Sequence, residues 1–137
     1  MSYWVYLMYL NKNNPHYPEG VWEPLTVRRH YGEGGTYAFS TESQFGGREY
    51  GSTKAELNVT WNYSKFYYAY LDKEEGLKWL DGKKAKEVIP RLKEAVHILG
   101  TKRSFDYWDS TNGNAGFALA ILLDWAQQHP NGVFEVH

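Results

Sequence analysis

The sequence contains no cysteine, which excludes disulfides, a thiolate nucleophile and cysteine-ligated metal sites. A chain without cysteine fits the cytoplasm. The formal net charge is −1, so the chain lacks the broad positive potential that attracts duplex nucleic acid, and we expect no nucleic-acid partner. The apolar residues 1–10 are too short to span a bilayer and lack the basic region and cleavage site of a signal peptide. We therefore expect a cytoplasmic protein without a membrane partner.

Common catalytic and cofactor signatures are also missing. The sequence has no Walker A motif, no G-x-G-x-x-G fingerprint and no G-x-S-x-G nucleophile turn. None of its five histidines has the H-x-H or H-E-x-x-H spacing of a metal site. We therefore expect no cofactor, no metal and no enzymatic activity, although Asp109, His30 and a tyrosine could still converge in space as a hydrolase site.

Aromatic residues, in contrast, are abundant: they make up 18% of the 137 residues and include 12 Tyr and 6 Trp. That is more than the core of one domain of this length needs. Tyr and Trp combine apolar area with a polar tip, which suits binding pockets and protein interfaces. The alternative is a tyrosine-rich core with some exposed rings.

The first half of the chain is predicted to form strands. Residues 2–10 are rich in Tyr, Val, Trp and Leu, which predicts a buried strand. A shorter strand is expected within residues 21–30, where Pro24 favours a sheet edge or a bulge. Residues 55–63 alternate between apolar and polar types, which predicts a third strand. One face of it comprises Leu57, Val59, Trp61 and Tyr63, and the other comprises Asn58, Thr60 and Asn62.

The second half is predicted to be mainly helical. A helix with Ser64 as its N-cap is expected to be interrupted at Gly76. Residues 83–100 predict a helix that either starts afresh at Pro90 or kinks there. Its buried face comprises Val88, Leu92, Ala95, Val96 and Leu99. Residues 114–130 form the clearest helix, and its buried stripe comprises Phe117, Ala118, Ile121, Leu122 and Trp125.

These elements, with a last short strand within residues 131–137, predict one fold class. It is a single-domain α+β protein over residues 1–137, in which a small antiparallel sheet packs against three to four helices.

Two polar, ring-bearing segments are the first candidate for a ligand site. The segment "NVTWNYS" places amides and hydroxyls among rings, and "DYWDSTNGNAG" does the same just before the clearest helix. Free N–H groups at a helix N-terminus attract anions, including phosphate. The candidate residues are Asn58, Thr60, Asn62, Tyr63, Tyr107, Trp108, Thr111 and Asn114. The alternative is structural: Thr111 or Asn112 caps the helix, and Trp108 packs on the core.

A second candidate is the adjacent pair Arg28 and Arg29, followed by glycine-rich sequence. The guanidinium fork binds phosphate oxygens bidentately, and a glycine-rich backbone can add N–H donors. The alternative is a solvated strand end with ordinary surface charge.

Parts of the sequence resemble a group of short phage and prophage proteins. The resemblance lies in "GGTYA…AELNVTWNYSKFY" and "IPRLKEAVHILG…DYWDSTNGNAGFALAILLDWAQQHPNGVF". The shared features are an N-V-T-[YW]-N-Y stretch and a Y-W-x-x-T-x-G-N-A sequence that opens the final helix. The resemblance covers roughly residues 34–137 and carries no established activity with it.

By analogy of class, this resemblance implies a phage anti-defence protein. Such proteins include compact, usually oligomeric ones that hold a nucleotide immune signal, such as a cyclic ADP-ribose variant or a cyclic dinucleotide, without cleaving it. We therefore expect a homo-oligomer that binds a small nucleotide-like ligand. The alternatives are a protein–protein inhibitor of a host defence or nuclease complex, a module that stacks on single-stranded nucleic acid, and a small nucleotide-processing enzyme.

Overall fold

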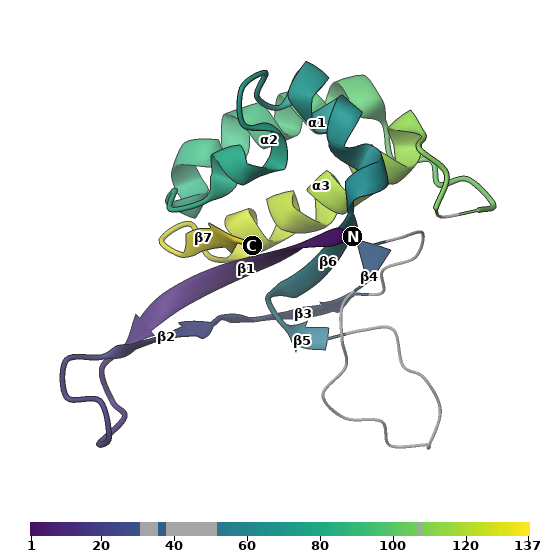
Figure 1. Ribbon diagram of the computed structural model, residues 1–137. Coiled ribbons are helices and arrows are strands. Elements are labelled where there is room, and N and C mark those ends of the chain that lie inside the picture. The colour runs from purple at the N-terminus through teal and green to yellow at the C-terminus, as the bar shows by residue number, and fades with distance from the viewer. Residues whose placement is uncertain (31–35, 38–51, 107) are drawn as a thin grey trace, which may run out of the picture.

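One long strand, β1 (Ser2–Asn11), organises the sheet (Figure 1). The computed structural model describes residues 1–30, 36–37, 52–106 and 108–137, and only the backbone of residues 28–30, 36–37 and 52–53. The antiparallel partners of β1 are β2 (Val21–Pro24), β6 (Glu56–Thr60) and β7 (Val133–Val136). The short strand β4 (Thr36–Tyr37) pairs with the far edge of β6.

Three strands diverge at a ring of backbone hydrogen bonds. Leu7 N donates to Ala55 O (3.1 Å), Ala55 N donates to Leu25 O (2.9 Å), and Leu25 N donates to Leu7 O (2.8 Å). On one side of this ring β1 continues with β2 as a hairpin. On the other side a separate two-stranded sheet is formed by β3 (Thr26–His30) and β5 (Ser52–Lys54). The single strand predicted within residues 21–30 is therefore two strands, and β2, which ends at Pro24, lies at the edge of the sheet as expected.

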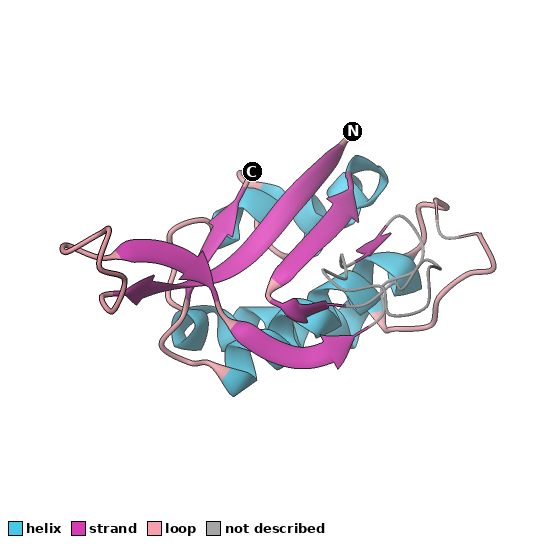
Figure 2. Ribbon diagram, turned by 90° about the horizontal axis from the view of Figure 1, so that it is seen from below, coloured by secondary structure: helices cyan, strands magenta, loops and turns pink. Residues whose placement is uncertain are grey.

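The two faces of the sheet differ sharply in composition. Val5 and Leu7 of β1 are fully buried, as are the residues beside them on β6 and β7. The alternate residues Trp4, Tyr6 and Met8 point to the opposite face. Figure 2 shows the strands in front of the helices when the molecule is seen from below. We call the face turned away from the helices the open face.

Three α-helices in the described part of the chain cover the other face of the sheet (Figure 1). They are α1 (Ser64–Tyr70), α2 (Ala85–Leu99) and α3 (Asn112–Gln128), with the 3-10 segments η1 (Trp61–Tyr63) and η2 (Gly76–Leu80). The predicted α+β class and its antiparallel sheet are confirmed. None of the helices built by these residues combines the length and apolar character needed to cross a membrane.

The predicted strand over residues 55–63 ends early, and this corrects the orientation of its last residues. The strand stops at Thr60, whose side-chain hydroxyl accepts a hydrogen bond from Asn62 N (3.3 Å) and caps η1. Trp61 is 46% exposed, whereas strand alternation would bury it. Tyr63 is buried as predicted, but from η1. Ser64 is the first residue of α1 rather than its N-cap.

The first predicted helix ends at Tyr70, before the interruption expected at Gly76, where the 3-10 segment η2 begins. The other two helices follow the predicted pattern with two refinements. α2 runs without a break from Ala85, so Pro90 lies inside one continuous helix, and four of the five predicted face residues are fully buried or nearly so. α3 is buried on most sides because it lies between the sheet and α2 (Figure 1). Phe117, predicted in its buried stripe, is only partly buried, while Leu119 is fully buried.

Candidate functional site

The two candidate segments lie side by side in the folded chain. Asn62 Nδ2 donates to Trp108 O (3.0 Å), and Ser110 Oγ donates to Asn62 O (2.6 Å). Trp61 and Trp108 are 46% and 51% exposed. We call the surface formed by Trp61, Asn62, Trp108 and Ser110 the tryptophan face. It lies at the N-terminal end of β1, because Trp61 N donates to Met1 O (3.2 Å).

Two glycines hold the segment before α3 directly against that helix. A Cβ atom on Gly113 would lie 1.7 Å from Lys102 O, and one on Gly116 would lie 1.8 Å from Gly100 O. Side chains at these positions are therefore sterically excluded. The lack of a side chain at Gly113 and Gly116 therefore lets α3 approach the backbone of residues 100–102 closely.

Asn114 organises the residues that precede α3. Its side chain is nearly fully buried, and Oδ1 accepts from Ser104 N (2.9 Å). Nδ2 donates to Ser104 Oγ (3.0 Å) and to Asp109 O (3.0 Å). Ser104 Oγ also donates to the carbonyl of Asp106. The Asn114 amide thus holds the loop in its observed shape, with both ends of the amide engaged within the chain.

The threonines of the two segments act as helix caps. Thr111 Oγ1 accepts from Asn114 N (3.2 Å) at the start of α3, as the structural alternative predicted. Thr60 does the same for η1 and is 2% exposed. Because both hydroxyls serve the backbone, they fix the shape of the tryptophan face.

The remaining predicted residues of "NVTWNYS" lie beneath the surface. Asn58 is nearly buried, and its Nδ2 donates to Ser2 Oγ (2.7 Å). Tyr63 is fully buried and packs edge-on against Tyr67, with ring centroids 6.5 Å apart. Of the predicted residues whose side chains the structure describes, Asn62 and Trp108 are therefore the ones exposed at the tryptophan face.

Tyr67 of α1 packs against the first turn of α3 and donates a hydrogen bond to it. It is fully buried, and its hydroxyl donates to Ala115 O (3.0 Å). Burial raises the pKa of Tyr67 well above its ordinary value, and the neighbouring Tyr63 and Tyr3 raise it further. The phenol is therefore a neutral hydrogen-bond donor that joins α1 to α3.

The other predicted ligand residues are described less fully. Tyr107 lies outside the described residues, and only the backbone of Arg28 and Arg29 is described, within β3. The start of β3 lies beside the C-terminal end of α3, since His129 Nε2 is 2.7 Å from Thr26 O. The tryptophan face lies at the opposite, N-terminal end of that helix.

Sequence reasoning noted the basic pair Lys102 and Arg103 before the aromatic loop but missed one exposed ring near the tryptophan face, Phe105. Phe105 is fully exposed, and the guanidinium of Arg103 lies 4.4 Å from the centroid of the Phe117 ring. Lys102 is exposed beside them. The sequence "KRSFDYW" interleaves cations and rings, and this pattern is the signal that could have identified Phe105.

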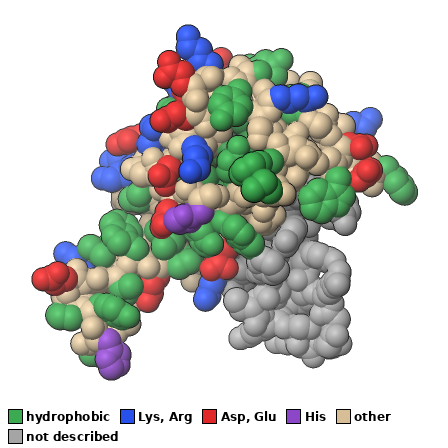
Figure 3. All heavy atoms as spheres, viewed as in Figure 1, with side chains coloured by type: hydrophobic (Ala, Val, Ile, Leu, Met, Phe, Trp, Pro, Cys, Tyr) green, Lys and Arg blue, Asp and Glu red, His purple; other side chains and the backbone are tan. Residues whose placement is uncertain are grey.

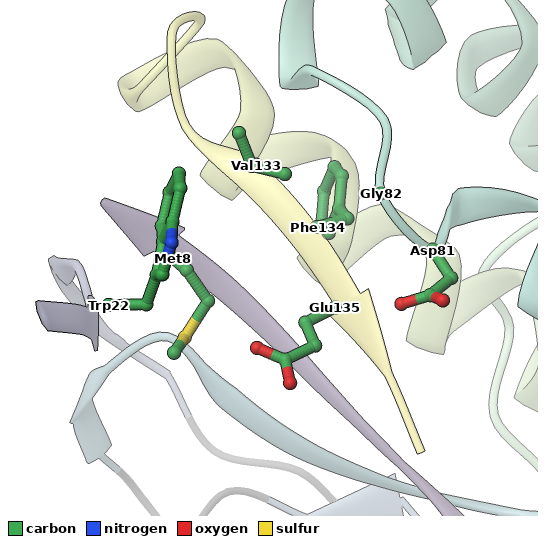
Figure 4. Close-up of a pocket in the computed structure, with 7 residues that line it drawn as sticks. All are labelled: Met8, Trp22, Asp81, Gly82, Val133, Phe134 and Glu135. Carbon is green, nitrogen blue, oxygen red and sulfur yellow. The ribbon is translucent and has the colours of Figure 1, made fainter. Parts of the chain in front are cut away.

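Sequence reasoning also missed a hollow at the other end of β1, with a volume of about 180 Å³. We call it the hairpin hollow, because it lies at the base of the β1–β2 hairpin; Figure 3 shows hydrophobic side chains gathered along that hairpin, at the lower left of the view. Its lining comprises Met8, Trp22, Asp81, Gly82, Val133, Phe134 and Glu135 (Figure 4). These residues are too distant in the sequence for any local pattern to group them.

Comparison with known proteins adds no assignment: no family model, no curated protein and no solved structure matches the chain. Among residues 1–30, 52–106 and 108–137, no three His, Cys, Asp or Glu side chains gather where they could hold a metal ion. The candidate site therefore stands on its own geometry, which is an exposed, hydrogen-bonded surface with two tryptophans.

Proposed function

We propose that this protein is a non-enzymatic binding protein that takes a small nucleotide-derived ligand at the tryptophan face. The observation that carries the proposal is the pair of half-exposed tryptophans, which come from distant segments joined by the Asn62 hydrogen bonds. A solvent-exposed indole is a stacking surface for a nucleobase. Asn62 and Ser110, which join the two segments, add an amide and a hydroxyl for base edges or ribose.

The cations needed for phosphate are close in the sequence. Lys102 and Arg103 are exposed on the segment that leads to the tryptophan face. Two stacked rings contribute roughly 2–6 kcal/mol, and a nanomolar complex needs about −12 kcal/mol. Tight binding therefore requires charge-assisted bonds to phosphate in addition to stacking.

The resemblance to short phage and prophage proteins suggests the biological setting. There, the protein sequesters a nucleotide immune signal of the host, such as a cyclic dinucleotide or a cyclic ADP-ribose variant, and releases it unchanged. By the same analogy the protein acts as a homo-oligomer. Sequestration requires affinity without turnover, which agrees with the absence of a catalytic motif from the sequence.

A protein partner is the second candidate, and one observation favours it. The tryptophan face is an open surface with a fully exposed Phe105 nearby. Exposed aromatic anchors on an open surface are typical of protein interfaces. In that case the protein inhibits a host defence or nuclease complex, and Trp108 is an anchor residue.

Thermal unfolding against a ligand panel tests the first candidate. We expect one compound among cyclic dinucleotides, cyclic ADP-ribose isomers and ADP-ribose to raise the melting temperature, since a ligand that binds only the folded state stabilises it. Chromatography of the recovered ligand should return it intact. Cleavage of the ligand would instead make the protein an enzyme.

Two matched variants locate the binding face. Trp108→Ala should abolish the thermal shift, whereas Trp22→Ala should preserve it, because Trp22 is also 51% exposed but lies at the other end of β1. A flat response to the whole panel contradicts the ligand proposal. Capture of one stoichiometric host protein, lost in Trp108→Ala, would then support the second candidate.

A further inference from the structure

The hairpin hollow combines an exposed ring with negative charge. Trp22 is 51% exposed, and Met8 and Val133 supply apolar lining beside it. In Figure 4 the carboxylate of Glu135 points from β7 toward Met8, and that of Asp81 lies across β7. We propose that the hairpin hollow binds an arginine side chain of a partner protein.

The chemistry of arginine fits these groups. Its planar guanidinium stacks on an indole while its N–H groups pair with a carboxylate, and the apolar part of the side chain needs a lining such as Met8 and Val133. Asp81 Oδ1 accepts a hydrogen bond from Val136 N (2.9 Å), so Asp81 is held in place at the rim. It adds a second negative charge beside Glu135.

The protein already builds this type of contact once within its own chain. The guanidinium of Arg91 lies 4.2 Å from the centroid of the Trp79 ring, and Arg91 Nη1 lies 3.3 Å from Asp72 Oδ1. There a tryptophan and a carboxylate together hold one guanidinium. At the hairpin hollow, Trp22 and Glu135 form the same combination, and no lysine or arginine among the described residues stacks on Trp22.

Other groups on the open face make it electronegative near the hollow. Tyr6 lies between Glu56 and Glu135 on the neighbouring strands. Burial raises the pKa of Tyr6, and the charges of Glu56 and Glu135 raise it further. The basic residues closest to the hollow in the strand pairing are Lys84, opposite Val133, and His137, whose Nε2 lies 2.6 Å from Glu135 Oε1. The second oxygen of Glu135 remains for a guanidinium to approach.

The surroundings of the hollow favour a protein over a free amine. Trp4, Tyr6, Met8 and Leu10 alternate along β1 and form one stripe on the open face. The Trp4 and Tyr6 rings are stacked, with centroids 6.4 Å apart. A small amine would contact the hollow alone, whereas a polypeptide that carries the arginine would also cover Leu10, which is 38% exposed at the hairpin end of the stripe.

Titration of the ¹⁵N-labelled full chain tests the inference with a defined probe. The probe is a blocked peptide, Gly-Gly-Arg-Gly-Gly, compared with versions in which citrulline or lysine replaces arginine. We expect saturable shifts of the Trp22 indole N–H and the Gly82 amide with the arginine peptide. Lysine should bind more weakly, because it lacks the planar fork, and the uncharged citrulline should not bind.

Charge-neutral variants separate the hollow from the rest of the hairpin. Glu135→Gln should raise the dissociation constant about fivefold or more. Glu23→Gln is the matched control, because Glu23 is adjacent to Trp22 but faces the opposite side, where it accepts from Tyr9 and Asn11. It makes the same change in charge and should leave the constant within about twofold.

Several outcomes would overturn the inference. Equal shifts with the citrulline peptide, or equal weakening by both variants, would remove the role of Glu135. Binding of spermidine as tight as that of the arginine peptide would make the occupant a small amine. If the chain self-associates and Trp22→Ala abolishes that association, the occupant of the hairpin hollow is a second copy of the chain. Trp108→Ala should bind the peptide normally, so failure here and failure of nucleotide binding are distinguishable.

Discussion

Trp108 and Trp22 are equally exposed, at 51% each, but the surrounding structure holds them in place in different ways. Trp108 belongs to a segment fixed to α3 by the buried Asn114 amide and by two glycines in close contact with neighbouring backbone. Trp22 belongs to the β1–β2 hairpin, and the register of β2 with β1 places its ring in the hairpin hollow beside Met8 and Val133. The two lie at opposite ends of β1, roughly 30 Å apart at the rise of an extended strand.

This difference shows which interactions determine the structure of the tryptophan face and which determine that of the hairpin hollow. At the tryptophan face, polar residues that looked like ligand groups are used to build the surface, and their neighbours Trp61 and Asn62 are presented to solvent. At the hairpin end, side chains alternate between faces, and the hollow forms only because β7 and the turn before α2 lie beside β1. Paired substitutions at the two ends can break or sharpen this contrast.

The largest effect is expected from the glycines. Gly116→Ala places a methyl group on the backbone of Gly100 and should lower the free energy of unfolding by about 3 kcal/mol or more. Gly82→Ala at the hairpin hollow meets no atom within 4 Å, and only its φ of +78° is unfavourable, so it should cost about 1–2 kcal/mol. Urea unfolding measures both. If both variants lose the same free energy of unfolding, the backbone around Gly116 can move apart to accept the methyl group at little cost.

An intermediate effect is expected from the amides. Asn114→Ala leaves Ser104 N and Asp109 O without their partner and should cost about 2 kcal/mol. Asn11→Ala removes a partly exposed amide that donates to Glu23 Oε2 (3.0 Å), and water replaces that partner, so the loss should stay below about 1 kcal/mol. Chemical denaturation compares the two variants. If Asn114→Ala impairs ligand binding without lowering stability, Asn114 contacts the ligand rather than only holding the loop.

The smallest effect at neutral pH is expected from the tyrosines. Tyr67→Phe removes the bond to Ala115 O and should cost about 1 kcal/mol. Its clearer signature is at high pH. The folded-state pKa of Tyr67 lies well above 10.0, so its contribution is fully present below pH 10 and is lost as the unfolded chain ionises above it. The slope is up to about 1.4 kcal/mol per pH unit.

The alkaline loss of stability should therefore be shallower in Tyr67→Phe than in the natural sequence. Tyr9→Phe is the control from the hairpin, because the Tyr9 hydroxyl is exposed and donates to Glu23 Oε2 (3.3 Å). Local burial and Glu23 also raise the pKa of Tyr9, so this variant should make the alkaline slope shallower as well, but less than Tyr67→Phe does, because Tyr9 is exposed. Unfolding measured between about pH 9 and pH 11.5 covers the window in which the unfolded tyrosine titrates. An unchanged slope in Tyr67→Phe would show that other groups cause the alkaline loss.

Much of the fold could be read from local patterns. The strand over residues 2–10, the edge position of the strand that contains Pro24 and the buried face of α2 follow from periodicity and backbone chemistry, and each is confirmed. The proximity of the two candidate segments was also expected, and it is observed. Local alternation failed at Trp61, because the Thr60 hydroxyl caps η1 and ends the strand before the pattern is complete.

The candidate sites were less readable for a physical reason. An asparagine that binds a ligand and one that binds its own backbone have the same side chain, so Asn114 looked alike in both roles until its partners were known. The hairpin hollow joins residues 8, 22, 81 and 135, which have no sequence relation. Only the register of β1 with β2 and β7 brings them together.

The sequence by itself determined the strand at residues 2–10, the buried face of α2 and the cap at Thr111, because each depends on periodicity or backbone geometry within a few residues. The tertiary structure alone decided which rings face solvent and which polar groups are already engaged. Solvent exposure and hydrogen-bond partners depend on contacts between residues that are far apart in the sequence. Several of those contacts form here because β1 pairs with strands from distant parts of the chain.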